Sequence, residues 1–554
     1  MSRRRGTLAG ALLGGAAVVA VWTAASRVAG FARWLVFSQT VGSTATGSAH
    51  TAANTLPNIL FEVAAGGALA AMVVPLLAAP LRRADVRRAG EICSALATWA
   101  LTVLVPAAAL FAWAAGPLTR AVGIGGLDAA DPGTAELAAQ LGAMFAAQLP
   151  LYGIGLVAAG ALQAAGRFAW PALAPLLSSI TVIGVYFVFG ALADGRQANP
   201  EQLGGAAVAV LGWGTTAGVA VLTLPLLIPA RRLGFRLRWT YRFPAGVGRR
   251  ARRLAASGVA ALAAQQLSVL VVVLIANARG GAGALPSYHY AQAVYLLPYA
   301  VMVAPLVTAA FPRLAGATTH DGELAARTRV TTRAVLAAGA SGAAVLVGAS
   351  GGVEAVFAAI DRSGGAPGLA GEVVAFATGL VGFALLTQCQ RVLYAAERPG
   401  AALAVTSAAY VALIAAAVTL TAGGGAQAME RTLAALGAAS SVGMTVGGVA
   451  GLVAVRHALG RAGLAGLSRT AAVALTGSAA GALAGWRLAA ALNTGGLGHA
   501  LAAAAVGAAV AAAVSLAAAA FGERALLRAV FARGAASSET PRRPAAPAPK
   551  SAVD

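Results

Sequence analysis

Residues 55–77 read TLPNILFEVAAGGALAAMVVPLL, a run that is long and apolar enough for a membrane helix. It has two unusual features, the opening tripeptide Leu56-Pro57-Asn58 and a single carboxylate, Glu62. Proline lacks the N–H and disfavours helix before it, so Pro57 predicts that the span starts or kinks part-way into the membrane. Irregular backbone at that depth is tolerated only beside a protein-enclosed cavity. We therefore expect Asn58 and Glu62 to face a cavity, with Pro57 as a hinge.

The composition indicates a membrane protein. The chain has 554 residues, of which 59% are hydrophobic and only 10% charged, whereas soluble globular chains carry about 25% charged residues. The two cysteines, Cys93 and Cys389, lie far apart in apolar segments, and the five histidines are scattered without ligand spacing. The sequence predicts no metal and no cofactor. A membrane enzyme is disfavoured, because no acid pair or His/Asp cluster gathers near either surface.

Apolar runs of about 20 residues predict an all-α polytopic fold with fourteen transmembrane helices. The N-terminal run resembles a signal peptide, but the many following spans favour a retained first span. The predicted spans are 10–36, 56–80, 93–116, 138–162, 169–193, 204–230, 256–277, 288–312, 334–358, 372–395, 400–422, 432–455, 470–492 and 499–521.

The formal net charge of +22 is a topology signal. With fourteen spans, most arginines fall in alternate loops, including the basic linker 231–255, and acids gather in the other loops. By the positive-inside rule both termini are cytoplasmic. A nucleic-acid role is therefore excluded. The Pro/Ala/Ser-rich segment 534–554 is predicted to be a disordered cytoplasmic tail.

Two pairs of matching segments predict an internal duplication. LQAAGRFAWP (162–171) and LYAAERPGA (393–401) share L-x-A-A-x-R and lie 231 positions apart. Pro57 and Pro298, in the second and eighth spans, lie 241 positions apart, and Pro298 is a second candidate hinge. The predicted organisation is an N-lobe (1–230), a C-lobe (256–455) and a further helix pair (470–521). A parallel six-plus-six repeat is typical of carriers.

Charges inside membrane spans are costly and therefore mark function. The first span holds Arg27 and Arg33, and the second holds Glu62. Glu62 either pairs with one of these arginines or contacts substrate. A cavity lined by guanidinium groups suits a phosphate or pyrophosphate, which accepts their paired hydrogen bonds. Arg391 and Arg487 are interpreted as interfacial or structural.

Five segments together resemble the MurJ/MviN family of lipid II flippases, which belongs to the multidrug/oligosaccharidyl-lipid/polysaccharide exporter superfamily. These segments are SRVAGFAR (26–33), ANTLPNIL (53–60), GGALAAMVVPLL (66–77), ALQAAGRFAWPALAPLL (161–177) and YHYAQAVYLLPYAVMVAPLVTAAFPRLA (288–315). The resemblance covers essentially the whole chain and is that of a divergent, actinobacterial-type member.

The resemblance implies a transporter in the cytoplasmic membrane. Such proteins carry the undecaprenyl-pyrophosphate-linked peptidoglycan precursor, lipid II, to the outer leaflet by alternating access, for cell-wall synthesis. Spans 13–14 would form a groove for the lipid tail. Arg27 and Arg33 match arginines of the family's central cavity, and we expect Asn58, Glu62 and Gln292 to line the same cavity. The implied partners are lipid II, membrane lipids and the cell-wall synthesis machinery.

The chain also departs from the family pattern. LFEV (60–63) and AQAV (291–294) stand where some members carry further cavity arginines, and Gly66 replaces an acid. Spans seven and eleven lack the carboxylates through which some relatives bind sodium, so the membrane potential is the simpler driver. Two alternatives stay open: an exporter of another polyprenyl-linked oligosaccharide or of drugs, and a non-transporting cell-wall scaffold.

Overall fold

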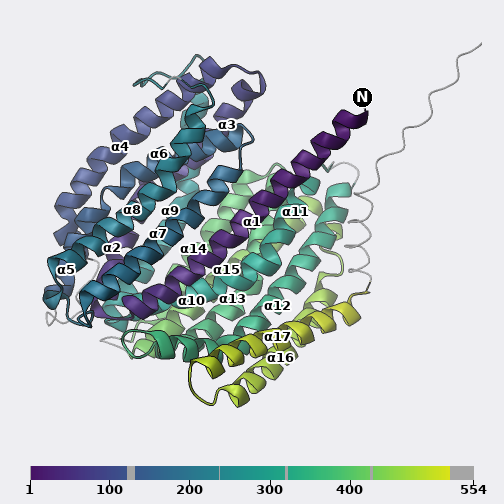
Figure 1. The fold of residues 1–554 in the computed structure, drawn as a ribbon. Coiled ribbons are helices and arrows are strands. Elements are labelled where there is room, and N and C mark those ends of the chain that lie inside the picture. Colours follow the sequence, from purple (N-terminus) through teal and green to yellow (C-terminus); the bar gives the residue numbers. More distant parts are fainter. Residues whose placement is uncertain (1, 122–131, 236, 318–321, 424–427, 525–554) are drawn as a thin grey trace, which may run out of the picture.

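The computed structural model describes residues 2–121, 132–235, 237–317, 322–423 and 428–524 (Figure 1). Within these ranges every regular element is helical, which confirms the predicted fold class. The predicted tail, 534–554, lies outside the described residues.

Eight α-helices form what we call the N-terminal bundle. They are α1 (Ser2–Thr40), α2 (Ala45–Phe61), α3 (Gly67–Arg82), α4 (Val86–Ala121), α5 (Pro132–Phe145), α6 (Gln148–Ala164), α7 (Ala169–Ala193) and α8 (Gly205–Arg231). A π-helix, η1 (Glu62–Gly66), joins α2 to α3, and a short 3-10 turn, η2 (Pro200–Gln202), precedes α8.

Seven α-helices form the C-terminal bundle, and a terminal pair follows. The bundle comprises α9 (Val247–Gly280), α10 (Ala284–Pro298), α11 (Ala304–Ala315), α12 (Glu323–Ile360), α13 (Leu369–Ala395), α14 (Pro399–Leu420) and α15 (Met429–Leu459). Here the π-helix η3 (Tyr299–Val303) joins α10 to α11. After the 3-10 turn η4 (Arg461–Leu464) come α16 (Leu467–Leu492) and α17 (Leu497–Gly522).

Helices lie over all fourteen predicted spans, and α7 has the predicted bounds. Among the described residues, twelve helical segments are long and apolar enough to cross a membrane. Neither α1 nor α16 is one of those twelve, so fourteen crossings stay a prediction. α16 carries two arginines, Arg469 and Arg487, which lower its apolar character.

The second span does not start at Pro57. Its helix begins at Ala45, where the Thr44 side chain accepts a hydrogen bond from the backbone N–H of Gly47 at 3.1 Å, and it runs through Pro57 to Phe61. The backbone irregularity follows the proline as the π-helix Glu62–Gly66. A proline inside a helix removes one backbone hydrogen bond and collides with the preceding turn. A π-bulge can accommodate the lost hydrogen bond and the steric clash without ending the helix.

The same arrangement recurs in the eighth span. Pro298 ends α10, and η3 follows at once. Gly42 and Gly283 stand before α2 and α10 with φ of 79° and 88°, and they are separated by the same 241 positions as the two prolines. These matched irregularities support the predicted duplication.

A second matched pair lies where α6 and α13 end. Gly166 and Glu397 both have positive φ, 74° and 57°, and are 231 positions apart. In both turns the next residue closes the helix with a backbone hydrogen bond of 2.8 Å, from Arg167 N to Leu162 O and from Arg398 N to Leu393 O. Both are left-handed helix caps, for which glycine is the usual residue.

The largest hydrophobic cluster crosses from one bundle to the other. It joins Phe37 of α1 and Tyr186 of α7 to Tyr290 of α10 and Phe376 of α13. A second cluster lies mainly within the N-terminal bundle, between α3, α4 and α6. The two bundles therefore share a continuous core.

The helices α16 and α17 pack closely on α12 through small residues, and Figure 1 shows the pair beside that helix. A Cβ built on Gly352 of α12 would lie 2.3 Å from the backbone N of Ala504, and one on Gly507 would lie 2.2 Å from Gly348 O. Only glycine permits such close backbone approach, which favours helix association in membranes.

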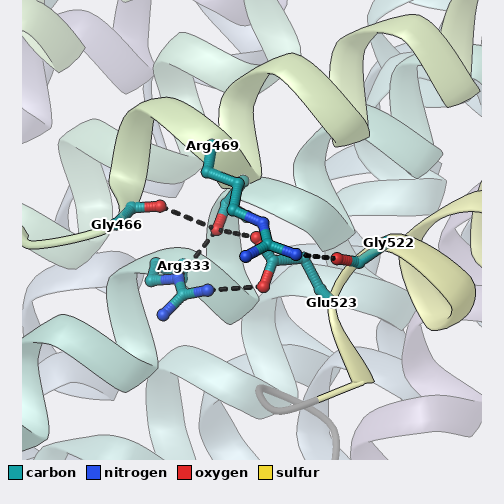
Figure 2. A network of polar contacts seen from close by, with 6 residues as sticks. Arg333, Gly466, Arg469, Gly522 and Glu523 are labelled. Atoms are coloured by element: carbon teal, nitrogen blue, oxygen red, sulfur yellow. Dashed lines mark hydrogen bonds and ion pairs between the residues drawn. The ribbon is translucent and has the colours of Figure 1, made fainter.

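A polar network fixes the same helix pair at its other end (Figure 2). The Arg333 guanidinium of α12 forms an ion pair with Glu523 at 2.5 Å and donates to Thr470 Oγ1 of α16 at 2.7 Å. Thr470 donates in turn to Glu523 Oε1 at 2.8 Å, and Arg469 donates to Gly522 O at 3.3 Å. The side chain of Glu523 is only 5% exposed, so this network is a buried clamp.

Candidate functional site

Arg27 and Arg33 line one cavity of about 570 Å³. Arg27 is exposed and Arg33 is half-buried. The walls come from α1, α7, α8 and α10, so the cavity lies between the two bundles. The structure thus brings together two arginines that are separated by about 120° around one helix.

The lining of this cavity suits an anion. Beside the two arginines its polar residues are hydroxyl-bearing, namely Thr23, Ser26, Ser178 and Ser179, and none of the described residues that line it is an acid. The Arg33 guanidinium lies 5.9 Å from the centre of the Trp34 ring, within cation–π distance. A planar guanidinium can present two N–H donors to one phosphate. The cavity can therefore hold a phosphate or pyrophosphate against apolar walls.

Glu62 lies at the start of η1 and is half-buried. Among the ion pairs of the described residues, none joins Glu62 to Arg27 or Arg33. Its carboxylate lies against Gly66, where a Cβ would sit 2.5 Å from Oε2. Of the two alternatives for Glu62, the ion pair with an arginine is therefore not made in this conformation, and contact of Glu62 with substrate stays a prediction.

The residues beside Glu62 also lie away from the arginines. Asn58 donates from Nδ2 to the Asn54 carbonyl at 2.9 Å, within its own helix. Pro57 is buried. Neither these two residues nor Glu62 borders the arginine-lined cavity.

Gln292 lines a second cavity, of about 250 Å³, inside the C-terminal bundle. This cavity lies between α9, α10, α13, α14 and α15. Its polar lining consists of Gln265, Ser268, Tyr288, His289, Gln292, Tyr295, Tyr410 and Ser440. Leu296 borders both cavities. The structure therefore places Gln292 next to the arginine-lined cavity but not within it.

Rings from both bundles close the interface beyond the arginines, and we call them the aromatic layer. Trp34 of α1 stacks on His289 of α10 at 5.3 Å, and Phe37 meets Tyr186 of α7 edge-on at 5.2 Å. Tyr290 stacks on Phe357 of α12 at 4.8 Å. Such ring pairs add packing energy beyond the area they bury.

Beyond the aromatic layer, Asp361 binds the loop between α1 and α2. Its Oδ2 accepts from Ser38 Oγ at 2.6 Å, and its two oxygens accept from the Ser43 backbone N–H at 3.1 and 3.2 Å. The Arg362 N–H donates to Ser38 O at 2.9 Å. We call this set of contacts the Asp361 latch. It ties the tip of the α12–α13 hairpin to the N-terminal bundle.

Two further bonds show that the four loops at this end meet. Gln197 Nε2 donates to Thr40 O at 3.0 Å, and the Gly283 N–H donates to Ser48 Oγ at 2.7 Å. The interface between the bundles is therefore closed at the Asp361 end, while the arginine-lined cavity lies on the other side of the aromatic layer.

The contacts of Asp361 with the N-terminal bundle could not be predicted from the sequence, where this aspartate is one of several acids in loops that hold few arginines. Pairing it with Ser38 and Ser43, more than 300 positions away, requires the packing of one bundle on the other, which leaves no local signal. Elsewhere, no three His, Cys, Asp or Glu side chains gather to hold a metal ion in the part of the chain that the structure describes.

Comparisons with known proteins agree with this arrangement. The family model described as lipid II flippase MurJ matches residues 37–517. A probable lipid II flippase MurJ from Synechocystis sp. is 28% identical over 235 residues, which cover 41% of this chain and 42% of that protein. The aligned stretch thus spans less than half of this curated relative.

Solved structures share the fold. A lipid II flippase MurJ in an inward closed conformation superposes with a TM-score of 0.68 at 16% identity, covering 92% of this chain and 99% of that chain. An inward-facing multidrug resistance transporter of the MATE family follows with a TM-score of 0.62 at 14% identity, covering 80% and 96%. Since the family model spans most of the residues, this chain belongs to the lipid II flippase MurJ family.

Proposed function

We propose that this protein is a lipid II flippase. As a transporter and not an enzyme, it moves the polyprenyl-pyrophosphate-linked peptidoglycan precursor from the inner to the outer leaflet of the cytoplasmic membrane. The observation that carries the proposal is the cavity that presents Arg27 and Arg33 without any acid in its lining. A pyrophosphate can accept paired hydrogen bonds from both guanidinium groups.

Arginine placement supports an orientation for the cycle. The described loops opposite the Asp361 end hold many arginines, including Arg83, Arg167, Arg232, Arg398 and Arg461. By the positive-inside rule these loops face the cytoplasm, so both termini are inside and the Asp361 latch faces out. The conformation described here is then closed to the outside, with the headgroup cavity on the cytoplasmic side of the aromatic layer.

In this proposal the helix pair α16–α17 binds the lipid tail. The two helices are fixed to α12 by close glycine contacts and by the Arg333–Glu523 clamp, so they move with the C-terminal bundle. A rigid apolar surface on the C-terminal bundle allows the long polyprenyl chain to stay in the membrane while the headgroup crosses. The product emerges at the outer leaflet, where we expect the cell-wall synthesis machinery to receive it.

A second candidate is export of another polyprenyl-linked oligosaccharide. Gln292 stands where a second basic cluster was expected, and it lies in the separate cavity. A headgroup that needs only one basic cluster would fit this arrangement.

The test is lipid II exposure on the outer face of cells depleted of every resident flippase. We expect wild-type protein to restore exposure and Arg33→Ala to leave it at the depleted level, with both proteins inserted in equal amounts. Wild type that inserts but exposes no lipid II would overturn the assignment in favour of another polyprenyl-linked glycan.

A further inference from the structure

The C-terminal bundle contains a buried acid that the proposed cycle has not used. Glu372 lies in the first turn of α13, and its side chain is 0% exposed. Neither of its carboxylate oxygens has a hydrogen-bond partner among the described residues. Nor does any ion pair of the described ranges include it.

No cation on the elements around Glu372 forms an ion pair with it among the described residues, although one guanidinium nitrogen of Arg279 is buried without a hydrogen-bond partner. Gly437 of α15 packs against it, so that a Cβ there would lie 3.4 Å from Glu372 Cγ. Tyr288 of α10 lies within electrostatic range of its charge. The other titratable groups on the helices and loops packed around this end of α13 are Arg279 of α9, Glu354 of α12, Asp361 and Arg362 of the preceding loop, Tyr410 of α14, and Glu430 and Arg431 of α15.

Three of these charged groups are engaged elsewhere. The Glu354 carboxylate accepts from the Gly368 and Ala370 N–H groups at 3.1 and 3.2 Å, at the start of α13. Glu430 lies against Gly368. Asp361 accepts the hydrogen bonds of the latch. Glu372 is therefore left inside the bundle with three acids on the elements packed around it and no bonded donor.

An ionised carboxylate cannot stay in such a place without a ligand. Its desolvation costs far more than the few kcal/mol that hold a protein folded. A metal cation would need several oxygen ligands, and no group of three or more His, Cys, Asp or Glu side chains among the described residues could hold one. A proton needs only the carboxylate itself.

We propose that Glu372 is a proton-binding site, occupied in the conformation closed at the Asp361 end and emptied when that end opens. The inference deepens the proposed function and rests on it, since it names the ion that drives or regulates the same transport cycle. It also locates a coupling acid in the C-terminal bundle, although spans seven and eleven contain none.

The position of Glu372 links it both to the latch and to water. The short segment from Asp361 to the start of α13 connects the two acids, and Glu354 holds that start of the helix in place. One turn further along α13, Phe376 lines the 250 Å³ cavity together with Tyr288. When the α12–α13 tip leaves the N-terminal bundle, the first turn of α13 gains access to water from the outer side. Loss of the proton then favours the open form, because a charged carboxylate is better solvated there.

Infrared spectroscopy of the full-length protein in lipid tests the site without any substrate. We expect wild type at neutral pH to show the C=O band of a protonated carboxylic acid. Glu372→Gln should lack this band, and Glu430→Gln, which changes a neighbouring exposed acid, should retain it. A wild-type spectrum without the band, or a band that survives in Glu372→Gln, would overturn the proposal. The wild-type result holds even if the variant fails to fold.

Transport in proteoliposomes then tests the coupling. Movement of labelled lipid II is measured with and without an imposed pH gradient, at zero membrane potential. We expect the gradient to change the wild-type rate and the two rates of Glu372→Gln to be equal. A Glu372→Gln variant that responds to the gradient like wild type would refute the coupling role. If no lipid II moves in either protein, the proposed function fails, whereas the infrared result still decides the proton site.

Discussion

Single charged residues carry most of the functional argument. Arg27 and Arg33 lie on one helix and line the same cavity, whereas Glu62 folds over Gly66 and leaves both arginines unpaired with it. Free guanidinium groups are available to a ligand, while paired ones would first have to break an ion pair. Both guanidinium groups are therefore accessible to an anionic ligand in the cavity.

Arg33→Ala should weaken lipid II binding about tenfold or more, because a hydrogen bond to a charged group contributes about 1.5–3 kcal/mol. Arg33→Lys should recover only part of the affinity, since an ammonium cannot form the paired contact. Binding of labelled lipid II to purified protein measures both effects. Arg487→Ala is the control, because this exposed arginine lies over Trp486 and away from the cavity. Equal affinities for wild type and Arg33→Ala would contradict the site.

Asp361→Ala should shift the protein towards a form open at the latch end, because it removes the acceptor of all the bonds that Ser38 and Ser43 make to this side chain. Val41, which is fully buried at the end of α1, provides a reporter as Val41→Cys. We expect an impermeant maleimide to label this cysteine faster in the Asp361→Ala background. Ser363→Ala is the matched control, since Ser363 bonds Asp361 only within its own loop. Unchanged labelling in Asp361→Ala would show that the latch does not hold this end closed.

Two kinds of contact attach elements to each other in this fold. Glycines bring α12 into backbone contact with α17, and the Arg333–Glu523 clamp fixes the ends of α16 and α17. A membrane offers no hydrophobic force between helices, so close packing and polar bonds must supply the association. Substitutions at these few positions should therefore strongly destabilise the packing of α16 and α17 on α12.

Adjacent glycines of α12 allow a matched test of the glycine contacts. Gly352→Ala should destabilise the protein by about 1–3 kcal/mol, the usual cost of overpacking, because its new Cβ would meet the Ala504 backbone. Gly351→Ala should be neutral or stabilising by up to about 1 kcal/mol, since open space surrounds that position and alanine favours helix. Thermal unfolding in detergent compares the two. Equal changes in stability for Gly352→Ala and Gly351→Ala would mean that the packing of α17 does not depend on the close contact at Gly352.

Glu523→Gln should cost about 3–5 kcal/mol, because it leaves the Arg333 charge without its buried partner. The double variant Arg333→Met/Glu523→Leu should recover much of the loss, since apolar residues can replace a buried ion pair. Thermal unfolding again gives the readout. If Glu523→Gln unfolds like wild type, the ion pair contributes little to holding α16 and α17.

Features that depend on neighbouring residues in the sequence could be predicted, whereas features that depend on contacts between distant segments could not. Arg27 and Arg33 could be predicted to line a cavity because charge within an apolar span is visible locally, and the structure places both in one cavity. The duplication, predicted from turns that repeat at fixed offsets, stays a prediction. The sequence predicted that the span starts or kinks at Pro57, and the structure shows a π-helix that begins five residues later, because sequence does not distinguish a helix start from a π-bulge. The contacts of Asp361 and the burial of Glu372 could not be predicted, since one lies in a loop and the other at a span boundary, and only packing reveals their surroundings.

At the scale of the whole molecule, the two bundles are joined at one end. The Asp361 latch and the aromatic layer join them at that end, and the arginine-lined cavity lies between them on the other side. Rocking of the bundles would open the latch and present the cavity to the opposite leaflet. The duplication supports this motion, because related bundles can exchange equivalent contacts.

Transfer of lipid II by the purified protein is the most direct test of the proposal that this protein is a lipid II flippase. Proteoliposomes containing fluorescent lipid II are treated with an impermeant quencher under an applied membrane potential, and the protected fraction is followed over time. We expect wild type to make the protected inner-leaflet lipid II accessible, and Arg33→Ala, reconstituted in equal amount, to behave like protein-free vesicles. A protected fraction that stays constant with correctly inserted wild type would contradict it.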